Sequence, residues 1–293
     1  MKPPIKINLV SVVVNGIKLY KLVKKLIRQL REEGKAMCRG WFKKKPTGPI
    51  TGYRVDLSSV VNNYPGTAND LNGCHNDQIN AENTLKKYWP DFVAYKFRDA
   101  EVTRANFKNT LNEALNEKWD TVIMFMDCCF SEDNTRDIHH AVKARFVAPE
   151  HPIVRHKVVK HLARSVDMKW IAFSACQDYQ TAADAYISGS YNGAFTWAAM
   201  KVLRPEMTYY DWFLATKTLL AESSFEQIPE MQGPEYLLNK KVFSDKTLFV
   251  QYSGHGTYTP DRNGDEADNQ DEAMYVYDGM ILDDELSEIL TKC

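Results

Sequence analysis

The stretch Thr121-Val122-Ile123-Met124-Phe125-Met126 (TVIMFM) is short, almost wholly apolar, and leads straight into Asp127-Cys128-Cys129. A second run of the same kind, Thr247–Tyr252 (TLFVQY), leads into Ser253-Gly254-His255. Short continuous apolar runs are typical of strands that are buried on both faces of a parallel sheet. Active sites gather at the carboxyl edge of such sheets, so neighbouring strands would bring this cysteine and this histidine to one place.

Strand and helix patterns alternate along the chain on either side of these runs. The alternation predicts an α/β fold with an open, mainly parallel sheet that is covered by helices on both faces. The predicted strands are Tyr53–Val61, Phe92–Phe97, Thr121–Met126, Trp170–Phe173 and Thr247–Tyr252, and the predicted helices are Asn76–Tyr88, Arg104–Asn116, Gly193–Leu203 and Tyr209–Leu220.

The first 50 residues differ in charge from the rest of the chain. They hold ten Lys and three Arg against two Glu, whereas the whole chain has 37 basic and 38 acidic residues. Apolar residues recur at a helical period over residues 17–31, and the opposite face is basic. This helix either packs on the body with its basic face in solvent, or contacts a membrane surface or a partner. We predict a basic N-terminal segment, 1–50, and a main domain, 51–293.

The bulk composition excludes several classes of protein. The near balance of charge argues against a nucleic-acid partner. No stretch is long and apolar enough to span a bilayer as a helix. The six cysteines are too sparse for a disulfide scaffold in 293 residues, which favours a reducing, cytoplasmic setting.

Cys129 and His255 together indicate nucleophilic catalysis. A thiol needs a nearby imidazole to become a thiolate nucleophile near neutral pH. Taken singly, a cysteine after an apolar strand is usually a small buried residue, and a histidine between glycines is usually a loop residue. The combination is much more specific than either residue alone.

The two motifs, Asp127-Cys128-Cys129 and Tyr252-Ser253-Gly254-His255-Gly256, resemble the cysteine and histidine motifs of the metacaspases, especially the bacterial orthocaspases. The resemblance covers about residues 53–293 and implies a caspase-like fold and a cysteine endopeptidase acting on protein or peptide substrates. Further matching segments are residues 64–66, 71–77, 176–185 and 193–196.

The resemblance implies a role for each matching residue. Cys129 matches the nucleophile and His255 the general base, with Cys128 as the runner-up nucleophile. The amides of Gly254 and Cys129 would form the oxyanion hole. The residues that match the pocket for P1, the substrate residue before the cut bond, are Asp77, Asp127, Cys74 and Ser253.

Paired carboxylates in that pocket would select a cationic P1 side chain. An arginine guanidinium can form a bidentate pair with carboxylates, and a lysine ammonium can bind them as a point charge. Cleavage after Arg or Lys is therefore expected. Each of these aspartates could instead be an ordinary cap or turn residue. Basic residues after the nucleophile, such as Arg136, Lys143 and Arg145, could permit self-cleavage or simply belong to a solvated loop.

The resemblance also implies a calcium site at Asp271, Asp283 and Asp284, since hard carboxylate clusters suit Ca²⁺. The run Asp283–Glu285 could equally be a helix N-terminus favoured by the helix dipole. Residues 261–272 are not an EF-hand loop, because the glycine falls at the fourth position and no helix precedes it.

The chain departs from the family pattern in two respects. The histidine segment of the family precedes the cysteine strand, whereas here it follows late in the chain, as if one block were transposed. Triads occur in different chain orders, so the order alone does not prevent catalysis. Phe130 and Glu132 stand where the family usually has His and Gly.

Two other readings compete with the peptidase. A non-catalytic caspase-like module that binds partners is favoured by the rearranged order and by Glu132, but it gives no reason to keep Cys129, His255, Asp77 and Asp127 together. A metal-thiolate site is disfavoured because the cysteines show no C-x-x-C spacing.

Overall fold

The computed structural model describes residues 49–66, 68–129, 142–148, 170–177, 180–260 and 270–291. These residues belong to one compact unit that begins at Pro49. The predicted basic helix at 17–31 lies outside the described residues, so its contact with a membrane or partner, and the division at residue 50, stay predictions. None of the described helices is long and apolar enough to cross a membrane.

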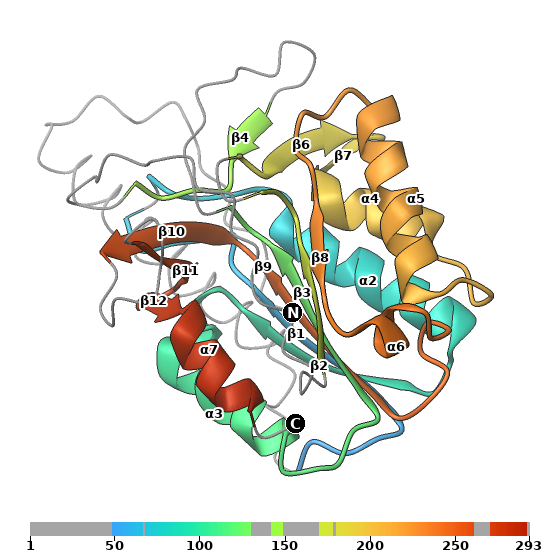
Figure 1. Cartoon of the computed structure of the whole chain (residues 1–293). Coiled ribbons are helices and arrows are strands. Elements are labelled where there is room, and N and C mark those ends of the chain that lie inside the picture. Colours follow the sequence, from blue (N-terminus) through green and yellow to red (C-terminus); the bar gives the residue numbers. More distant parts are fainter. Residues whose placement is uncertain are drawn as a thin grey trace, which may run out of the picture. The chain divides into compact units, whose positions relative to one another are not determined.

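The centre of the fold is a six-stranded sheet in the order β2-β1-β9-β3-β5-β8 (Figure 1). Its strands are parallel except β8, which pairs antiparallel with β5. All seven residues of β3 and of β9 are buried, which explains why both read as continuous apolar runs. The strands are β1 (Arg54–Val60), β2 (Phe92–Arg98), β3 (Thr121–Asp127), β5 (Trp170–Ser174), β8 (Glu230–Gln232) and β9 (Thr247–Ser253).

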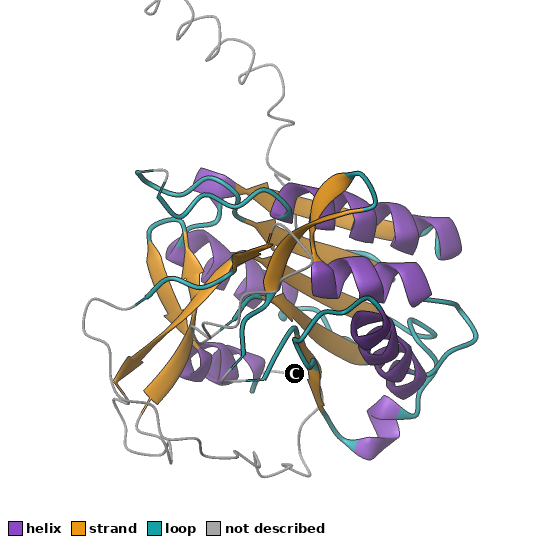
Figure 2. Ribbon diagram, turned by 90° about the horizontal axis from the view of Figure 1, so that it is seen from above, coloured by secondary structure: helices purple, strands orange, loops and turns teal. Residues whose placement is uncertain are grey.

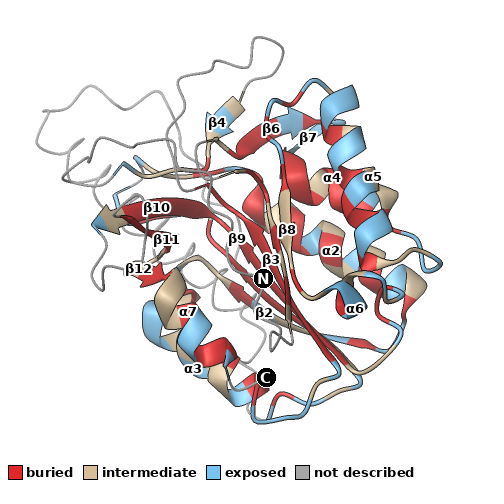
Figure 3. Ribbon diagram, in the orientation of Figure 1, coloured by how far each residue is buried: buried red, intermediate tan, exposed pale blue. Residues whose placement is uncertain are grey.

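Helices cover both faces of this sheet, as predicted (Figures 1 and 2). One hydrophobic cluster joins Phe125 and Phe249 of the sheet to α2, α4 and α5, and the other joins Met124 and Val250 to α3 and α7. The central strands are coloured as buried, and the surrounding helices carry both buried and exposed residues (Figure 3). The helices are α2 (Cys74–Tyr88), α3 (Arg104–Ala114), α4 (Ala194–Val202), α5 (Tyr209–Glu222), α6 (Glu235–Leu238) and α7 (Asp283–Leu290), with a short 3₁₀ turn, η2, at Asp99–Glu101.

Local sequence signals determine where several of these helices begin. Thr103 caps α3, because its hydroxyl accepts a hydrogen bond from the Asn106 amide. Thr208 caps α5 in the same way and forms a capping box with Asp211. The start of α3 at Arg104 was predicted from the sequence.

Two small antiparallel sheets complete the fold. One contains β10 (His255–Pro260), β11 (Gln270–Val276) and β12 (Gly279–Leu282). The other contains β4 (Val142–Ala144), β6 (Ala183–Ile187) and β7 (Ser190–Gly193) in the order β4-β6-β7. These strands were not predicted from the sequence.

The position of β9 determines where the histidine lies. Although β9 comes late in the chain, it lies between β1 and β3 and runs parallel to both. Its register pairs Ser253 with Asp127 of β3. Cys129 and His255 each follow that pair by two residues, so both leave the sheet at the same carboxyl edge.

Candidate active site

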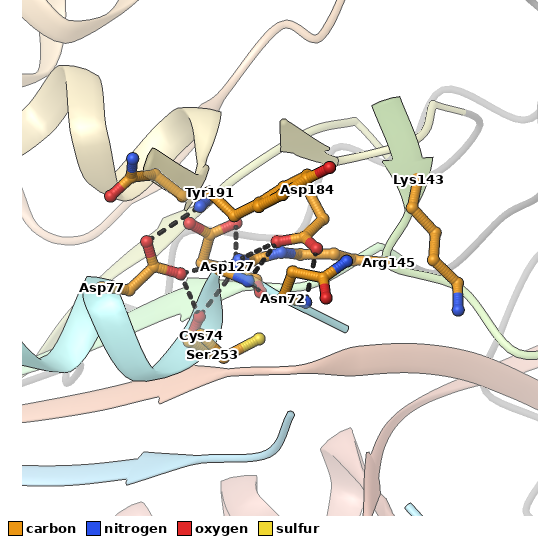
Figure 4. A network of polar contacts seen from close by, with 12 residues as sticks. Asn72, Cys74, Asp77, Asp127, Lys143, Arg145, Asp184, Tyr191 and Ser253 are labelled. Carbon is orange, nitrogen blue, oxygen red and sulfur yellow. Dashed lines mark hydrogen bonds and ion pairs between the residues drawn. The ribbon is translucent and has the colours of Figure 1, made fainter. Parts of the chain in front are cut away.

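A pocket of buried carboxylates at this edge encloses the side chain of Arg145 (Figure 4). One terminal nitrogen, Nη2, lies 2.7 Å from Asp77 Oδ2 and 3.1 Å from Asp184 Oδ1. The other, Nη1, lies 3.2 Å from Asp127 Oδ1 and donates to Ser253 Oγ at 2.7 Å. We call these four residues, Asp77, Asp127, Asp184 and Ser253, the carboxylate pocket.

Hydrogen bonds from three different elements hold the carboxylates in place. Asp77 of α2 accepts the Gly193 amide at 2.8 Å and the Ser253 hydroxyl at 2.6 Å. Asp127 at the end of β3 accepts both the amide and the hydroxyl of Thr196 at the start of α4, at 3.0 and 2.6 Å. These hydrogen bonds to Asp77 and Asp127 do not involve Arg145.

Asp184 of β6 is held in the same manner. Its two carboxylate oxygens accept the amides of Asn72 and Gly73, at 2.8 and 2.9 Å. Asp184 was not among the predicted pocket residues. Cys74, which was predicted to line the pocket, lies next to Ser253 at the start of α2 (Figure 4), and burial raises the pKa of its thiol well above the usual range.

The electrostatics of the pocket favour a cation. Three aspartates face one guanidinium, and all four side chains are fully buried. Burial raises the pKa of Asp77 to about 6, although the adjacent Arg145 opposes that rise. Burial also disfavours a charged guanidinium, yet Asp127, Asp77 and Asp184 keep the pKa of Arg145 well above its ordinary value.

Two glycines make room for this arrangement. A Cβ at Gly193 would lie 2.5 Å from Arg145 Nη1 and would also collide with Asp127 Oδ2. A Cβ at Gly73 would collide with Asp184 Oδ1 and lie 2.7 Å from the Asn192 carbonyl carbon. Both glycines fall inside segments that match the metacaspases, but the sequence alone did not indicate their role in the pocket.

The backbone around Arg145 is extended and bound on both sides. We call residues 142–147 the Arg145 segment. Its β4 part pairs antiparallel with β6, with Lys143 opposite Asp184, and the Arg145 amide donates to the Ala182 carbonyl at 3.0 Å. On the other side of Arg145, Phe146 forms a bridge with Gly256, and the Val147 amide donates to the Gly256 carbonyl at 3.0 Å.

Two amides converge on the carbonyl oxygen of Arg145. The Gly256 amide donates to it at 2.9 Å and the Cys129 amide at 3.3 Å. The amide of Gly254, which was predicted to be an oxyanion donor, instead donates to the Asp127 carbonyl at 3.3 Å and joins β9 to β3. The cysteine and histidine segments thus meet at one peptide carbonyl.

The hydrogen bonds of His255 determine which ring nitrogen is basic. Nε2 lies 2.6 Å from the Asn69 carbonyl oxygen, which can only accept, so Nε2 carries the proton. Nδ1 is buried and has no hydrogen-bond partner among the described residues. Burial, together with the cations Lys143 and Arg145, lowers the pKa of His255 to about 4, so the ring is neutral near pH 7.

Tyr64 supports this histidine, and the sequence analysis did not assign it a role. Its hydroxyl accepts the His255 amide at 2.8 Å, and its ring lies 5.0 Å from the imidazole, centroid to centroid. Tyr252, in the histidine motif, donates its hydroxyl to the His255 carbonyl at 2.9 Å.

The adjacent cysteines belong to opposite sides of the sheet. Cys129 packs in the cluster formed with α2, α4 and α5, whereas Cys128 packs in the cluster formed with α3 and α7. Burial raises the pKa of the Cys128 thiol well above its usual range, which disfavours its thiolate. Cys176 lies beside Cys129. Its hydrogen bond with the Cys129 thiol is the larger cause, and burial the second, of the raised pKa of the Cys176 thiol.

The predicted calcium ligands lie away from the carboxylate pocket, at the β11–β12 hairpin. Asp271 is buried on β11, and Asp283 and Asp284 begin α7 directly after β12. Among the described residues, no three His, Cys, Asp or Glu side chains form a cluster that could hold a metal ion. Calcium binding therefore stays a prediction. Phe130, Glu132 and Arg136 lie outside the described residues.

Parts of the chain are similar to known caspase-like proteins. The family model of the caspase domain matches residues 101–243, which include Asp127 and Cys129 but not the histidine segment. Metacaspase-1 of Schizosaccharomyces pombe is 30% identical over 110 residues, 36% of this chain and 26% of the relative. Metacaspase-1A of Aspergillus niger is 46% identical over 59 residues, 19% of this chain and 15% of the relative.

The chain therefore spans about a quarter or less of the length of these two curated relatives. Among solved structures, caspase-1 from Spodoptera frugiperda aligns with a TM-score of 0.43 and 9% identity, over 69% of this chain and 96% of that one. The caspase-domain match and the metacaspase relatives agree with the mainly parallel α/β sheet. The fold is caspase-like, and parts of the chain are similar to metacaspases.

Proposed function

We propose that this protein is a cysteine endopeptidase that cleaves after Arg or Lys, with Cys129 as nucleophile and His255 as general base. One observation carries the proposal: the Arg145 segment is bound as a substrate would be. Its guanidinium fills the carboxylate pocket, and its carbonyl oxygen accepts the amides of Cys129 and Gly256. The pocket corresponds to the P1 site, and the two amides correspond to an oxyanion hole.

The proposed reaction follows from the tautomer of His255. The free Nδ1 takes the proton of the Cys129 thiol, and the thiolate attacks the carbonyl carbon of the P1 residue. The oxyanion that forms is held by the amides of Cys129 and Gly256. His255 then gives the proton to the leaving amine, and water, deprotonated by His255, hydrolyses the thioester to release the P1 carboxylate and regenerate the thiol.

The same geometry supports self-processing at the bond between Arg145 and Phe146. This bond follows the carbonyl that the two amides bind, and Phe146 continues along Gly256 on the leaving side. Of the basic residues considered as self-cleavage positions, Arg145 alone has its side chain in the carboxylate pocket among the described residues. While the Arg145 segment stays bound, it excludes other substrates from the pocket.

Three further expectations belong to this proposal. Substrates would be proteins or peptides with a cationic P1 residue. A reducing, cytoplasmic setting would keep Cys129 as a thiol. Calcium would stimulate cleavage through Asp271, Asp283 and Asp284, where it would supply a positive charge that neutralises the carboxylates.

The first experiment is to incubate the purified chain and to sequence the N-termini of any products. We expect a new N-terminus at Phe146, which is absent in Cys129→Ala. The same preparations are then given fluorogenic peptides with Arg, Lys or Asp at P1, with and without Ca²⁺. Cleavage after Arg and Lys, but not Asp, would support the acidic P1 pocket, and the response to Ca²⁺ would test the metal.

The outcomes separate the peptidase from its rival. If neither the chain nor any peptide is cut at any Ca²⁺ concentration, the peptidase proposal fails and the non-catalytic module is favoured. Cleavage that persists in Cys129→Ala would contradict the assigned nucleophile. The rival would also predict no reaction of Cys129 with a peptide electrophile that carries Arg at P1.

A further inference from the structure

The side chain of Lys143 contacts a loop that also holds the proposed catalytic base. Lys143 Nζ donates to the carbonyl oxygen of Asp70 at 2.5 Å and lies 3.4 Å from that of Ala68. Lys143 is mostly exposed and lies apart from the carboxylate pocket (Figure 4). Its ammonium therefore meets backbone carbonyl dipoles and not the aspartates that bind Arg145.

The residue between these two carbonyls is Asn69, whose own carbonyl accepts His255 Nε2 at 2.6 Å. Three consecutive carbonyl groups thus accept hydrogen bonds from two side chains. The outer two, of Ala68 and Asp70, contact the Lys143 ammonium, and the middle one, of Asn69, accepts from the His255 imidazole. Hydrogen bonds tie the loop to its base, since the Tyr64 amide donates to Asp70 Oδ1 and the Leu71 amide to the Asn62 carbonyl, both at 2.8 Å. The Asp70 carboxylate is accordingly turned toward Tyr64.

In substrate numbering, Arg145 is P1, Ala144 is P2 and Lys143 is P3. The pairing of β4 with β6 fixes this spacing, because it holds the backbone extended from Val142 to Ala144. Any peptide that follows the same path would carry its P3 side chain to the loop at residues 68–70.

We propose that the carbonyl groups of Ala68 and Asp70 form a subsite for a cationic P3 side chain, and that a cation bound there stabilises the loop that orients His255. The inference rests on the proposed function, because it uses the Arg145 segment as the image of a substrate. It narrows the substrate class to sequences with two basic residues spaced as Lys-x-Arg or Arg-x-Arg.

The chemistry fits an ammonium or guanidinium group. Such a group carries several donors and no acceptor, and hydrogen bonds from a charged donor are stronger than neutral ones. The site is solvent-exposed, which weakens the interaction, so we expect about a tenfold effect on the rate and not more.

The first test uses the full chain. Lys143→Met removes the charge at similar length, and Lys143→Arg keeps it. We expect Lys143→Met to slow the appearance of the Phe146 N-terminus by about tenfold, and Lys143→Arg to restore most of the rate. Lys217→Met, on the exposed side of α5, is the matched control and should leave the rate unchanged.

The second test supplies the segment as a peptide to the self-processed chain. The peptide Val-Lys-Ala-Arg-Phe-Val is compared with its norleucine analogue at P3, which keeps the methylene stem without the ammonium. We expect the lysine peptide to have the higher kcat, because its cation stabilises the loop that carries Asn69. A benefit confined to KM would overturn the link to His255.

The results distinguish this inference from the function it rests on. Equal cleavage of both peptides and of Lys143→Met, with Arg still required at P1, would overturn the P3 subsite and leave the peptidase standing. Failure to cut the chain and every Arg peptide would remove the proposed function and the inference with it.

Discussion

At the scale of single residues, the carboxylate pocket should bind an arginine at P1 more tightly than a lysine. The two terminal nitrogens of Arg145 contact different partners, Asp77 and Asp184 on one side and Asp127 and Ser253 on the other. A lysine ammonium is a single point charge and cannot reach both sets at once. Both residues should be accepted at P1, but not equally.

We expect Arg to be preferred over Lys at P1 by about tenfold in kcat/KM, and Asp184→Asn to reduce this preference. The variant keeps one oxygen for the Asn72 or Gly73 amide but removes the charge that faces Arg145 Nη2. Paired Arg and Lys peptides measure the ratio. An unchanged ratio in a folded variant would mean that Asp184 only supports the loop.

His255 makes folding stability depend on pH. Its pKa is about 4 in the folded protein, against 6.5 for an ordinary histidine. Between these values the unfolded chain binds a proton that the folded chain does not, so the free energy of unfolding falls as the pH falls from 6.5 to 4. The full loss is about 3 kcal/mol.

This pH dependence can be isolated by comparing Cys129→Ala with Cys129→Ala/His255→Gln, a background in which self-cleavage is absent. Urea unfolding at pH 7 and at pH 4.5 should show a larger loss of stability in the chain that keeps His255. Parallel losses would contradict the buried, neutral imidazole. The comparison cancels the opposite contribution of Asp77, whose raised pKa stabilises the fold at lower pH.

At the scale of elements, the two adjacent cysteines after β3 lie on opposite sides of the sheet. Successive residues of an extended chain face opposite sides of a sheet, and Cys128 and Cys129 enter opposite hydrophobic clusters accordingly. Cys128→Ala should therefore keep cleavage at Arg145 and lower the free energy of unfolding by about 1 kcal/mol, since a small buried group is lost. Loss of cleavage in a stably folded Cys128→Ala would reverse the assignment of the nucleophile.

The sequence predicted the long elements because each has a strong local pattern. The buried runs of β3 and β9 and the capped helix α3 were found within one or two residues. β4 was missed because three residues carry no period, and its pairing with β6 joins distant parts of the chain. The dipeptide Ser188-Gly189 is a turn signal that could have revealed the β6–β7 hairpin, and both residues have positive φ in the structure, 52° and 94°.

The candidate site was predictable to the extent that its residues follow the buried strands. Asp127 and Ser253 end the two buried strands as a pair, and Cys129 and His255 each come two residues later, so all four lie at one edge of the sheet. Asp184 and Gly256 were not predicted, since their roles depend on which backbone groups face Arg145 after folding. Arg145 was noticed only as one basic residue among several, because the pocket that encloses it is built from α2, β3, β6 and β9.

At the scale of the whole molecule, self-cleavage after Arg145 would divide the chain without separating its parts. The first fragment would carry β1, β2 and β3, and the second β5, β8 and β9. The second fragment's β9 lies between two strands of the first. We expect both fragments to elute together on size exclusion and to separate only in denaturant; separation in native buffer would contradict the strand order.

The late position of β9 also has a consequence during synthesis. A ribosome makes β1 and β3 first, and the strand that joins them, with His255 and Gly256 after it, is the last of the six to emerge. A nascent chain therefore holds the thiol of Cys129 before it holds His255, the proposed base, or the Gly256 amide. If the chain is the peptidase proposed above, this order of synthesis would delay any cleavage by the growing polypeptide until the sheet can close around its last-made strand.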